Sequence, residues 1–392
     1  MIRPLLAFGL CLLAPALQAQ TEASWKEIGR LEVDRLQNIL VKEAPAFTGD
    51  AQVYSPPRHA VRLFTVSYPS VIPEQGNRPT LASGLVAIPD SGAKRLPIVS
   101  YQHGTVMSKL GVPSSCERSP ETLLMIAQFA SQGYAVIGAD YFGLGQSTEP
   151  DGYVVLGSHQ QACFDMLQVG QRVLSSQGIE PAEVFLTGWS QGGVVTMSFL
   201  DKLEGLGVPV RAAGTASAQC DGLVMLTGFL QFPRPLDAPW VSAMFILTAF
   251  SYENYYRQPG LARSLFTEEQ YDIARRIYEK QPYQEAEWPG DLKRLIRKEY
   301  FDPVYFRNSA YGKLVSEIRP YRWQIRTPVR MYYGDVDECL TIGLARLPSE
   351  YQHAMGNNLV QAISAGPDAN HRKTFARAVS EWKRWFDECL KP

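Results

Sequence analysis

Ser190 stands between glycines in the pattern Gly188-x-Ser190-x-Gly192, where a strand and a helix are expected to meet. Residues 184–187 form a compact apolar and β-branched run, typical of a buried strand, and residues 194–200 repeat apolar side chains at helical spacing. The glycines clear the turn of obstructing side chains and leave the serine hydroxyl at its apex. The pattern predicts that Ser190 is a nucleophile. The alternative is a glycine-rich turn that merely closes a loop.

His371 is favoured as the base for this serine. A serine hydroxyl is a weak nucleophile until a base accepts its proton, and the base needs an acid to fix its tautomer. We expect His371 in a loop between a helix-like run and the C-terminal helix, from which it can reach the carboxyl edge of a parallel sheet. The alternative is a solvated loop histidine. His353 is a weaker candidate, His59 falls in an early strand, and His159 is expected at a helix end.

Three aspartates are candidates for the acid. Asp335 and Asp337 follow a predicted strand and are two residues apart, so they face the same way in an extended turn and the pattern does not separate them. Asp221 directly follows the preceding predicted strand. The alternative is that all three shape turns or face solvent. Glu338 has a longer side chain and is expected to face away from Asp337.

Two backbone amides are expected to stabilise the oxygen anion that forms when a carbonyl is attacked. One is the amide of Gln191, directly after the nucleophile, and the second is the amide of Thr105, in a loop after a predicted strand. Gly104 lets the backbone approach the reacting atoms there. His103 in the same loop is expected to be structural rather than catalytic.

The elements around these residues alternate between strand and helix. An antiparallel pair at residues 59–68 and 80–88 is followed by strands and helices in turn, which predicts an α/β fold with a mostly parallel sheet covered on both faces. Residues 25–41 are predicted to form a docking helix. Residues 221–325 interrupt this alternation of strands and helices, and they hold 20 of the 43 Phe, Tyr and Trp residues. We interpret them as a helical cap inserted into a core of residues 20–220 and 326–392.

Composition and charge exclude several classes of function. The chain carries 38 Lys and Arg against 39 Asp and Glu, so no basic surplus suggests a nucleic-acid partner. Residues 1–19 combine one arginine, an apolar run and a small residue near a plausible cleavage point, which predicts a signal peptide and a secreted or periplasmic protein. No later segment is apolar for long enough to span a membrane.

The cysteine spacing matches no zinc pattern, and export favours disulfides.

The motifs together resemble the α/β-hydrolase superfamily. Ser190, Asp337 and His371 follow its Ser–Asp–His order, and residues 101–105 (Tyr-Gln-His-Gly-Thr) resemble the oxyanion loop of secreted bacterial and fungal lipases and esterases. Residues 138–145 resemble the strand and loop that come next in those enzymes. The resemblance favours Asp337 over Asp335 as the acid. It covers residues 96–371 apart from the cap, and implies an α/β-hydrolase fold.

This resemblance also implies an activity. We expect a secreted serine ester hydrolase that forms an acyl-enzyme, needs no metal or organic cofactor, and acts on a small-molecule or lipid ester. The alternatives are a serine peptidase on the same fold and an exported binding protein that has lost catalysis. Residues 240–250, the most apolar run of the cap, predict an apolar acyl pocket. Secreted lipases often carry a disulfide near the acid, and a helix ending at Cys389 should pack beside that turn, so we expect a Cys339–Cys389 disulfide.

Overall fold

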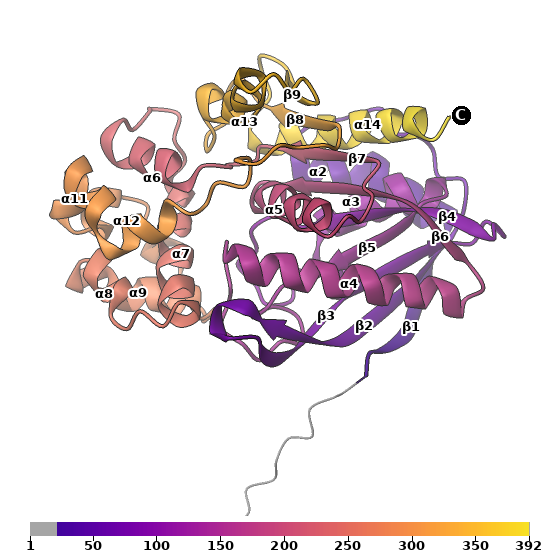
Figure 1. Cartoon of the computed structure of the whole chain (residues 1–392), viewed down its shortest axis with the longest axis horizontal. Helices are drawn as coiled ribbons and strands as arrows, with labels where there is room; N and C mark the ends of the chain where they lie inside the picture. The colour runs from indigo at the N-terminus through magenta and orange to yellow at the C-terminus, as the bar shows by residue number, and fades with distance from the viewer. Residues whose placement is uncertain (1–21, 392) are drawn as a thin grey trace, which may run out of the picture.

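Nine strands form one sheet in the computed structural model, which describes residues 22–391 (Figure 1). Their order across the sheet is β1-β2-β3-β5-β4-β6-β7-β8-β9. The strands are β1 (Ser24–Leu31), β2 (Val61–Ile72), β3 (Arg78–Pro89), β4 (Arg95–Gln102), β5 (Ala135–Ala139), β6 (Glu180–Trp189), β7 (Ala212–Ala216), β8 (Val329–Tyr333) and β9 (Val360–Ser364).

The sheet begins antiparallel and continues parallel. Strands β1, β2 and β3 pair antiparallel, β3 pairs antiparallel with β5, and all pairs from β5 to β9 are parallel. The predicted pair at 59–68 and 80–88 is thus present as β2 and β3. The prediction of an α/β fold with a mostly parallel sheet is confirmed. Since parallel strands end at the same edge, the turns after β4, β6, β7 and β8 come together there.

Helices cover both faces of the sheet. In β6, Val184 and Leu186 pack on one side and Phe185 on the other, because successive strand residues point to opposite faces. The first side carries α4 (Leu156–Ser176) and α5 (Gln191–Gly205); the second carries α1 (Val33–Asn38), α2 (Ala44–Thr48), α3 (Pro120–Phe129) and α14 (His371–Cys389). Helix α13 (Ile342–Ala354) connects β8 to β9.

Seven α-helices occupy about half of the chain between β7 and β8 and lie together beside the sheet (Figure 1). They are α6 (Gly222–Gln231), α7 (Ser242–Tyr255), α8 (Leu261–Leu265), α9 (Glu268–Tyr278), α10 (Leu292–Leu295), α11 (Pro303–Asn308) and α12 (Ala310–Val315). We call them the inserted helices. Tyr252, Tyr255 and Tyr311 are at most 1 % exposed, so much of the aromatic excess of this segment serves packing.

Two predicted elements are wrong. Residues 25–41 are not one helix, because the first part of this segment forms the edge strand β1 and helix begins only at Val33. Trp25 and Ile28 lie exposed on β1, whereas Leu36 is buried on α1, so the apolar stripe combined residues from two elements. The run before His371 is the strand β9 rather than a helix, and His371 is the first residue of α14.

The Cys339–Cys389 disulfide prediction is also wrong, because all five cysteines of residues 22–391 are free thiols. Helix α14 starts beside the acid, where His371 contacts Asp337, and Cys389 is its last residue. A helix rises about 1.5 Å per residue, so Cys389 lies roughly 27 Å from that start. A disulfide needs Cα atoms within about 7 Å. The helix therefore carries Cys389 away from Cys339.

The predicted signal peptide, residues 1–19, lies outside the described residues. None of the helices within residues 22–391 has the length and apolar character needed to cross a lipid bilayer.

Candidate active site

Ser190 occupies the sharp turn between β6 and α5. Its backbone has φ 56° and ψ −123°, a conformation with positive φ that a residue with a side chain adopts only when its surroundings enforce it. A Cβ atom at Gly188 would lie 2.1 Å from the carbonyl oxygen of Gly192, and one at Gly192 would lie 2.0 Å from that of Gln102. The two glycines of the pattern are therefore required for this turn to close.

His371 and Asp337 meet at the same edge of the sheet. Nδ1 of His371 lies 3.0 Å from both carboxylate oxygens of Asp337. Asn370 accepts a hydrogen bond from the Lys373 amide and so begins α14 at His371, while Asp337 follows β8. Because a carboxylate only accepts, the Nδ1 atom carries the proton and the Nε2 atom of a neutral ring is left free to accept one.

The environment of Asp337 keeps it ionised. Its Oδ2 atom accepts a hydrogen bond from Ser217 Oγ at 2.7 Å, and its Oδ1 atom accepts from the amides of Cys339 and Leu340 at 2.8 and 2.9 Å. Burial opposes the charged carboxylate, but His371 and these donors outweigh it and lower the pKa of Asp337. Burial likewise opposes the imidazolium of His371, but Asp337 outweighs it and raises the pKa of His371.

The predicted oxyanion donors flank the serine. Gln191 is the first residue of α5, so its amide has no partner inside the helix. Thr105 lines the same cavity as Ser190 and His371. The close approach of the Gln102 carbonyl to Gly192 shows that the loop after β4 passes directly beside the turn that holds the serine. The arrangement brings all five predicted residues to one edge of the sheet.

Glu121 holds this loop from the core side, and sequence reasoning missed it. The Gly104 amide donates to both of its carboxylate oxygens, at 3.0 and 3.2 Å. Glu121 lies in the first turn of α3 and is only 6 % exposed. Burial raises its pKa to about 7. An acidic residue near a helix start usually faces solvent, so only the packing of α3 under the loop reveals this contact.

Glu338, which was expected to face away from Asp337, contacts the backbone of the histidine. Its Oε2 atom accepts a hydrogen bond from the His371 amide at 3.0 Å, and its side chain lines the cavity. A carboxylate that accepts from the first amide of a helix caps the helix start. Glu338 therefore helps to fix the first residue of α14, which is His371.

The remaining acid candidates lie apart from the imidazole. Asp335 accepts a hydrogen bond from Ser364 Oγ at an exposed position. Asp221 caps α6 through the Val224 amide and accepts from Tyr321. Of the three candidate aspartates, Asp337 alone contacts His371.

Two of the other histidines, His103 and His159, are buried in structural surroundings. His103 is fully buried, its ring nitrogens lie 2.7 and 3.2 Å from backbone carbonyls, and burial lowers its pKa. His159 accepts from the Val154 amide near the start of α4, and burial lowers its pKa to about 3. His353 is exposed in the last turn of α13.

A cavity of about 1010 Å³ opens over the serine. One side comes from the sheet edge through Thr105, Ser190 and His371. The other side comes from the inserted segment and is mainly aromatic and apolar, with Pro239, Trp240, Ala243, Met244, Tyr283 and Trp288. Helix α7 reaches the cavity near its start and is otherwise packed, so only part of the apolar run 240–250 lines the cavity.

Residues that could hold a metal are not grouped at the cavity. Within residues 22–391, no group of three or more His, Cys, Asp or Glu side chains is placed to hold a metal ion.

The sheet order, the strand–turn–helix serine and the acid and histidine that follow it define the α/β-hydrolase fold. Solved structures agree with this assignment. The chain is similar to a candidate hydrolase from Legionella pneumophila, with a TM-score of 0.83, 19 % identity and coverage of 94 % of this chain and 98 % of the other.

Two further structures have names that state an activity. The rice cell wall degrading esterase LipA from Xanthomonas oryzae has a TM-score of 0.78 at 16 % identity, with 94 % of this chain and 98 % of the other covered. Candida antarctica lipase A has a TM-score of 0.66 at 14 % identity, with 95 % and 83 % covered. No family model and no curated protein sequence matches the chain.

Proposed function

We propose that the chain is a serine hydrolase that cleaves carboxylic esters. The observation that carries the proposal is the contact between His371 and the buried Asp337 at the edge of a cavity that Ser190 also lines. A serine in a strained turn, a histidine with one free nitrogen and an ionised aspartate are the groups that nucleophilic acyl transfer requires.

The proposed reaction has two halves. Ser190 Oγ attacks the ester carbonyl while His371 Nε2 accepts its proton, and the amides of Gln191 and Thr105 stabilise the oxygen anion. The anion collapses to an acyl-enzyme, and His371 returns the proton to the departing alcohol. Water then attacks the acyl-enzyme with the same base, which releases the carboxylic acid and restores the serine hydroxyl.

The names of the structural neighbours favour esters over peptides. One is named as an esterase and another as a lipase. Labelling by a fluorophosphonate probe, followed by turnover of p-nitrophenyl esters, tests the proposal. Labelling without ester turnover would favour a peptidase, and a purified chain that neither labels nor turns over esters would favour a binding protein.

We also propose that the inserted segment, residues 221–325, acts as a cap over the cavity and binds the apolar part of the ester. The wall formed by Trp240, Met244 and Trp288 supports this proposal. Each buried CH₂ group contributes about 0.8 kcal/mol, so butyrate and octanoate esters should be preferred to acetate. Equal efficiency across the three would contradict an acyl-binding wall.

Export stays a proposal as well. It rests on the composition of residues 1–19. The mass of the mature protein, expressed with its own N-terminus in a bacterial host, measures whether cleavage occurs near residue 19 and in which compartment the protein accumulates.

A further inference from the structure

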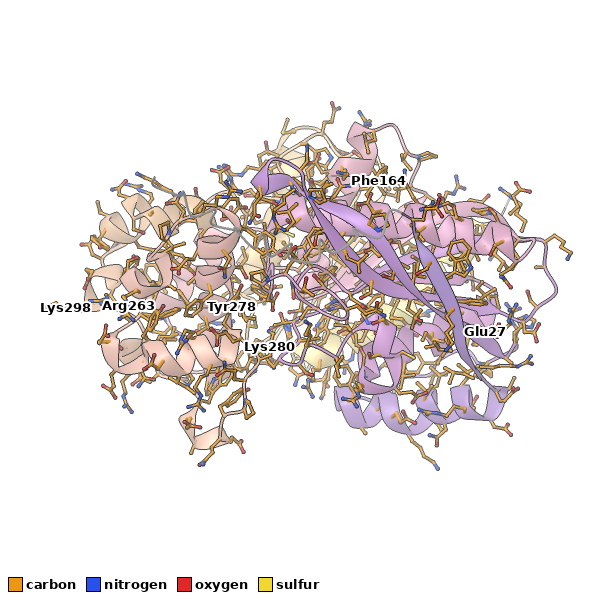
Figure 2. All side chains as sticks on the ribbon, turned by 90° about the horizontal axis from the view of Figure 1, so that it is seen from below. Glu27, Phe164, Arg263, Tyr278, Lys280 and Lys298 are labelled. Carbon is orange, nitrogen blue, oxygen red and sulfur yellow. The ribbon has the colours of Figure 1, made fainter. Side chains whose placement is uncertain are left out.

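Lys280, just after α9, reaches out of the inserted helices into the loop that carries Thr105. Its Nζ atom donates a hydrogen bond to the Val106 carbonyl at 3.1 Å. Thr105 and Met107, on either side of Val106, both line the cavity. Figure 2 labels Lys280 and Tyr278 on the side of the inserted helices that faces the sheet, with Arg263 further out. The lysine is therefore a direct connection between the inserted helices and the loop beside Ser190.

The side chain of this lysine is largely removed from solvent and is paired. Its ammonium lies 2.8 Å from Asp151 Oδ2, and the two side chains are 10 % and 8 % exposed. A buried charge is tolerated only when partners satisfy it, and two partners from the core, Asp151 and the Val106 carbonyl, do so here. The ion pair and the hydrogen bond fix the ammonium at one position between two core loops.

The backbone conformation of Lys280 also indicates that the contacts of its side chain matter. Its φ is 57°, in the left-handed region, and its amide donates to the Ile277 carbonyl where α9 ends. Glycine or asparagine is favoured at such a helix end, because other side chains crowd the backbone. A cation is favourable near the C-terminus of a helix, but its charge does not explain why a residue with a long side chain adopts this left-handed backbone. The contacts of its side chain give a reason.

The core segment that receives Lys280 is itself attached to the inserted helices. The carbonyl of Asp151 accepts hydrogen bonds from Tyr278 of α9 at 2.8 Å and from Ser251 of α7 at 2.7 Å. Tyr153, two residues on, receives a hydrogen bond of 3.2 Å from the Thr105 hydroxyl. The inserted helices thus reach the Thr105 loop by two routes, one through Lys280 and one through Tyr153.

Thr105 lies between two anchors. Glu121, on α3 of the core, accepts a hydrogen bond from the Gly104 amide, and Lys280, at the end of α9 of the inserted helices, donates one to the Val106 carbonyl. A donor that stabilises an oxyanion must already be in place when charge develops, because reorientation during the reaction removes its advantage. The peptide that carries the Thr105 amide is also held on its Gly104 carbonyl by His103 Nδ1 at 2.7 Å, so the loss of the Val106 anchor should shift this amide out of position rather than free it.

We propose that Lys280 is a positioning residue for the oxyanion site: it holds the Val106 carbonyl, one residue beyond Thr105, so that the loop keeps the Thr105 amide pointed at the developing anion. The inference rests on the proposed ester hydrolysis. If Lys280 has this role, activity depends on how the inserted helices pack against the core, because the lysine directly follows α9.

The test is Lys280→Met, measured as kcat per active site titrated with a fluorophosphonate. Loss of one oxyanion donor typically costs about 10²–10³ in kcat, so partial misplacement should lower kcat about 10- to 100-fold. KM for a short soluble ester should change less than about threefold. A trifluoromethyl ketone, whose adduct places an anionic oxygen in the same site, should bind more weakly by about the factor lost in kcat.

Two further variants keep the test decisive if Lys280→Met folds poorly. Removing one partner of a buried pair is strongly destabilising, so Lys280→Met/Asp151→Asn, which leaves no unpaired charge, should fold better with the same loss of kcat. Asp151→Asn alone keeps the donor to Val106 and should lose less. Lys383→Met is the matched control, because Lys383 is 3 % exposed and paired with Asp387 on α14; its kcat per titrated site should be unchanged.

Two results would overturn the inference. One is kcat within twofold of wild type in both the Lys280→Met single and double variants. The other is a loss of kcat without weaker ketone binding, since it would show a general structural role. An inactive and unlabelled wild type would instead remove the proposed function, and the positioning role with it.

Discussion

The two sides of the cavity are built in different ways. On the sheet side, the carboxylate of Asp337 is held by four groups, His371, Ser217 and two backbone amides, all within 3.0 Å. On the inserted side, Trp240 and Trp288 present mainly ring surface, and Trp240 is 38 % exposed. Reacting groups need fixed positions, which short hydrogen bonds to the main chain provide. A binding wall needs only shape and apolar area. Substitutions should therefore act differently on the two sides.

The largest effect is expected at Ser190 on the sheet side. Ser190→Ala removes the nucleophile and should lower kcat about 10⁶-fold for every ester, and should abolish fluorophosphonate labelling. Because Ser190 is 8 % exposed and the change removes one oxygen atom, the melting temperature should stay within a few degrees. Turnover and labelling of the purified variant check this. Residual activity above about a thousandth of wild type would reassign the nucleophile.

The acid should show the next largest effect. An aspartate that fixes the tautomer of its histidine is worth about 10⁴ in turnover when replaced by asparagine, so Asp337→Asn should lose several orders of magnitude. Asp335→Asn and Asp221→Asn are matched controls, because neither carboxylate contacts His371. Both should stay within about tenfold of wild type in kcat on one soluble ester. A crippled Asp221→Asn with an active Asp337→Asn would move the acid to the loop after β7.

The sheet side could be predicted from the sequence because its signals are local. The glycines around Ser190 and the strand before Asp337 lie within a few residues of the groups that they position, and the order of elements then brings these groups to one edge. The strand β9 was missed because its five residues follow a polar stretch and end in a loop, which gives no clear period.

The anchors of the Thr105 loop could not be predicted in the same way. Glu121 and Lys280 come from α3 and the end of α9, 17 and 174 residues from their partners in the loop. On the sequence, each is a charged residue at the end of a helical run, where solvated charges are common. Only tertiary packing brings these two side chains to the loop, so the sequence around each residue does not reveal the contact.

The pH dependence should follow His371, with a midpoint displaced from the ordinary histidine value. The base must be neutral to accept the serine proton, so kcat/KM should rise about tenfold per pH unit and level off above the pKa of His371. Asp337 raises that pKa against the opposing effect of burial, so the midpoint should lie above about 6.5. A pH–rate profile of the free enzyme measures it. A midpoint below 6.5 would show that burial outweighs Asp337.

Glu121 titrates in the same region and offers a check on the loop anchor. Its folded pKa of about 7 exceeds 4.5, so its contribution to stability is full below pH 4.5 and is lost as pH rises through 7. Glu121→Gln keeps an oxygen for the Gly104 amide but removes the titration. The variant should gain stability relative to wild type between pH 4.5 and 7, by at most about 3 kcal/mol, while kcat falls less than tenfold.

Urea unfolding of both proteins across that pH range measures the difference. A constant difference in unfolding free energy would show that Glu121 does not titrate in the folded protein. A change in the midpoint of the Glu121→Gln rate profile would show that the wild-type profile contains Glu121 as well as His371.

The smallest effect is expected on the inserted side, at Trp288. Its ring lines the cavity and packs against Tyr283, but it contacts neither His371 nor the Thr105 loop through a hydrogen bond among the described residues. Trp288→Ala should therefore leave kcat for p-nitrophenyl acetate within twofold. For the octanoate ester the lost apolar contact should raise KM about three- to tenfold.

The control for Trp288→Ala is Trp25→Ala, which removes a ring of the same type, 37 % exposed, from the edge strand β1, far from the residues that line the cavity. It should leave both esters unchanged. The informative quantity is the ratio of octanoate to acetate efficiency, because it cancels any loss of folded protein. If Trp288→Ala lowers kcat for acetate as much as for octanoate, the aromatic wall takes part in positioning the reacting groups. The division between a sheet side for chemistry and an inserted side for binding would then be wrong.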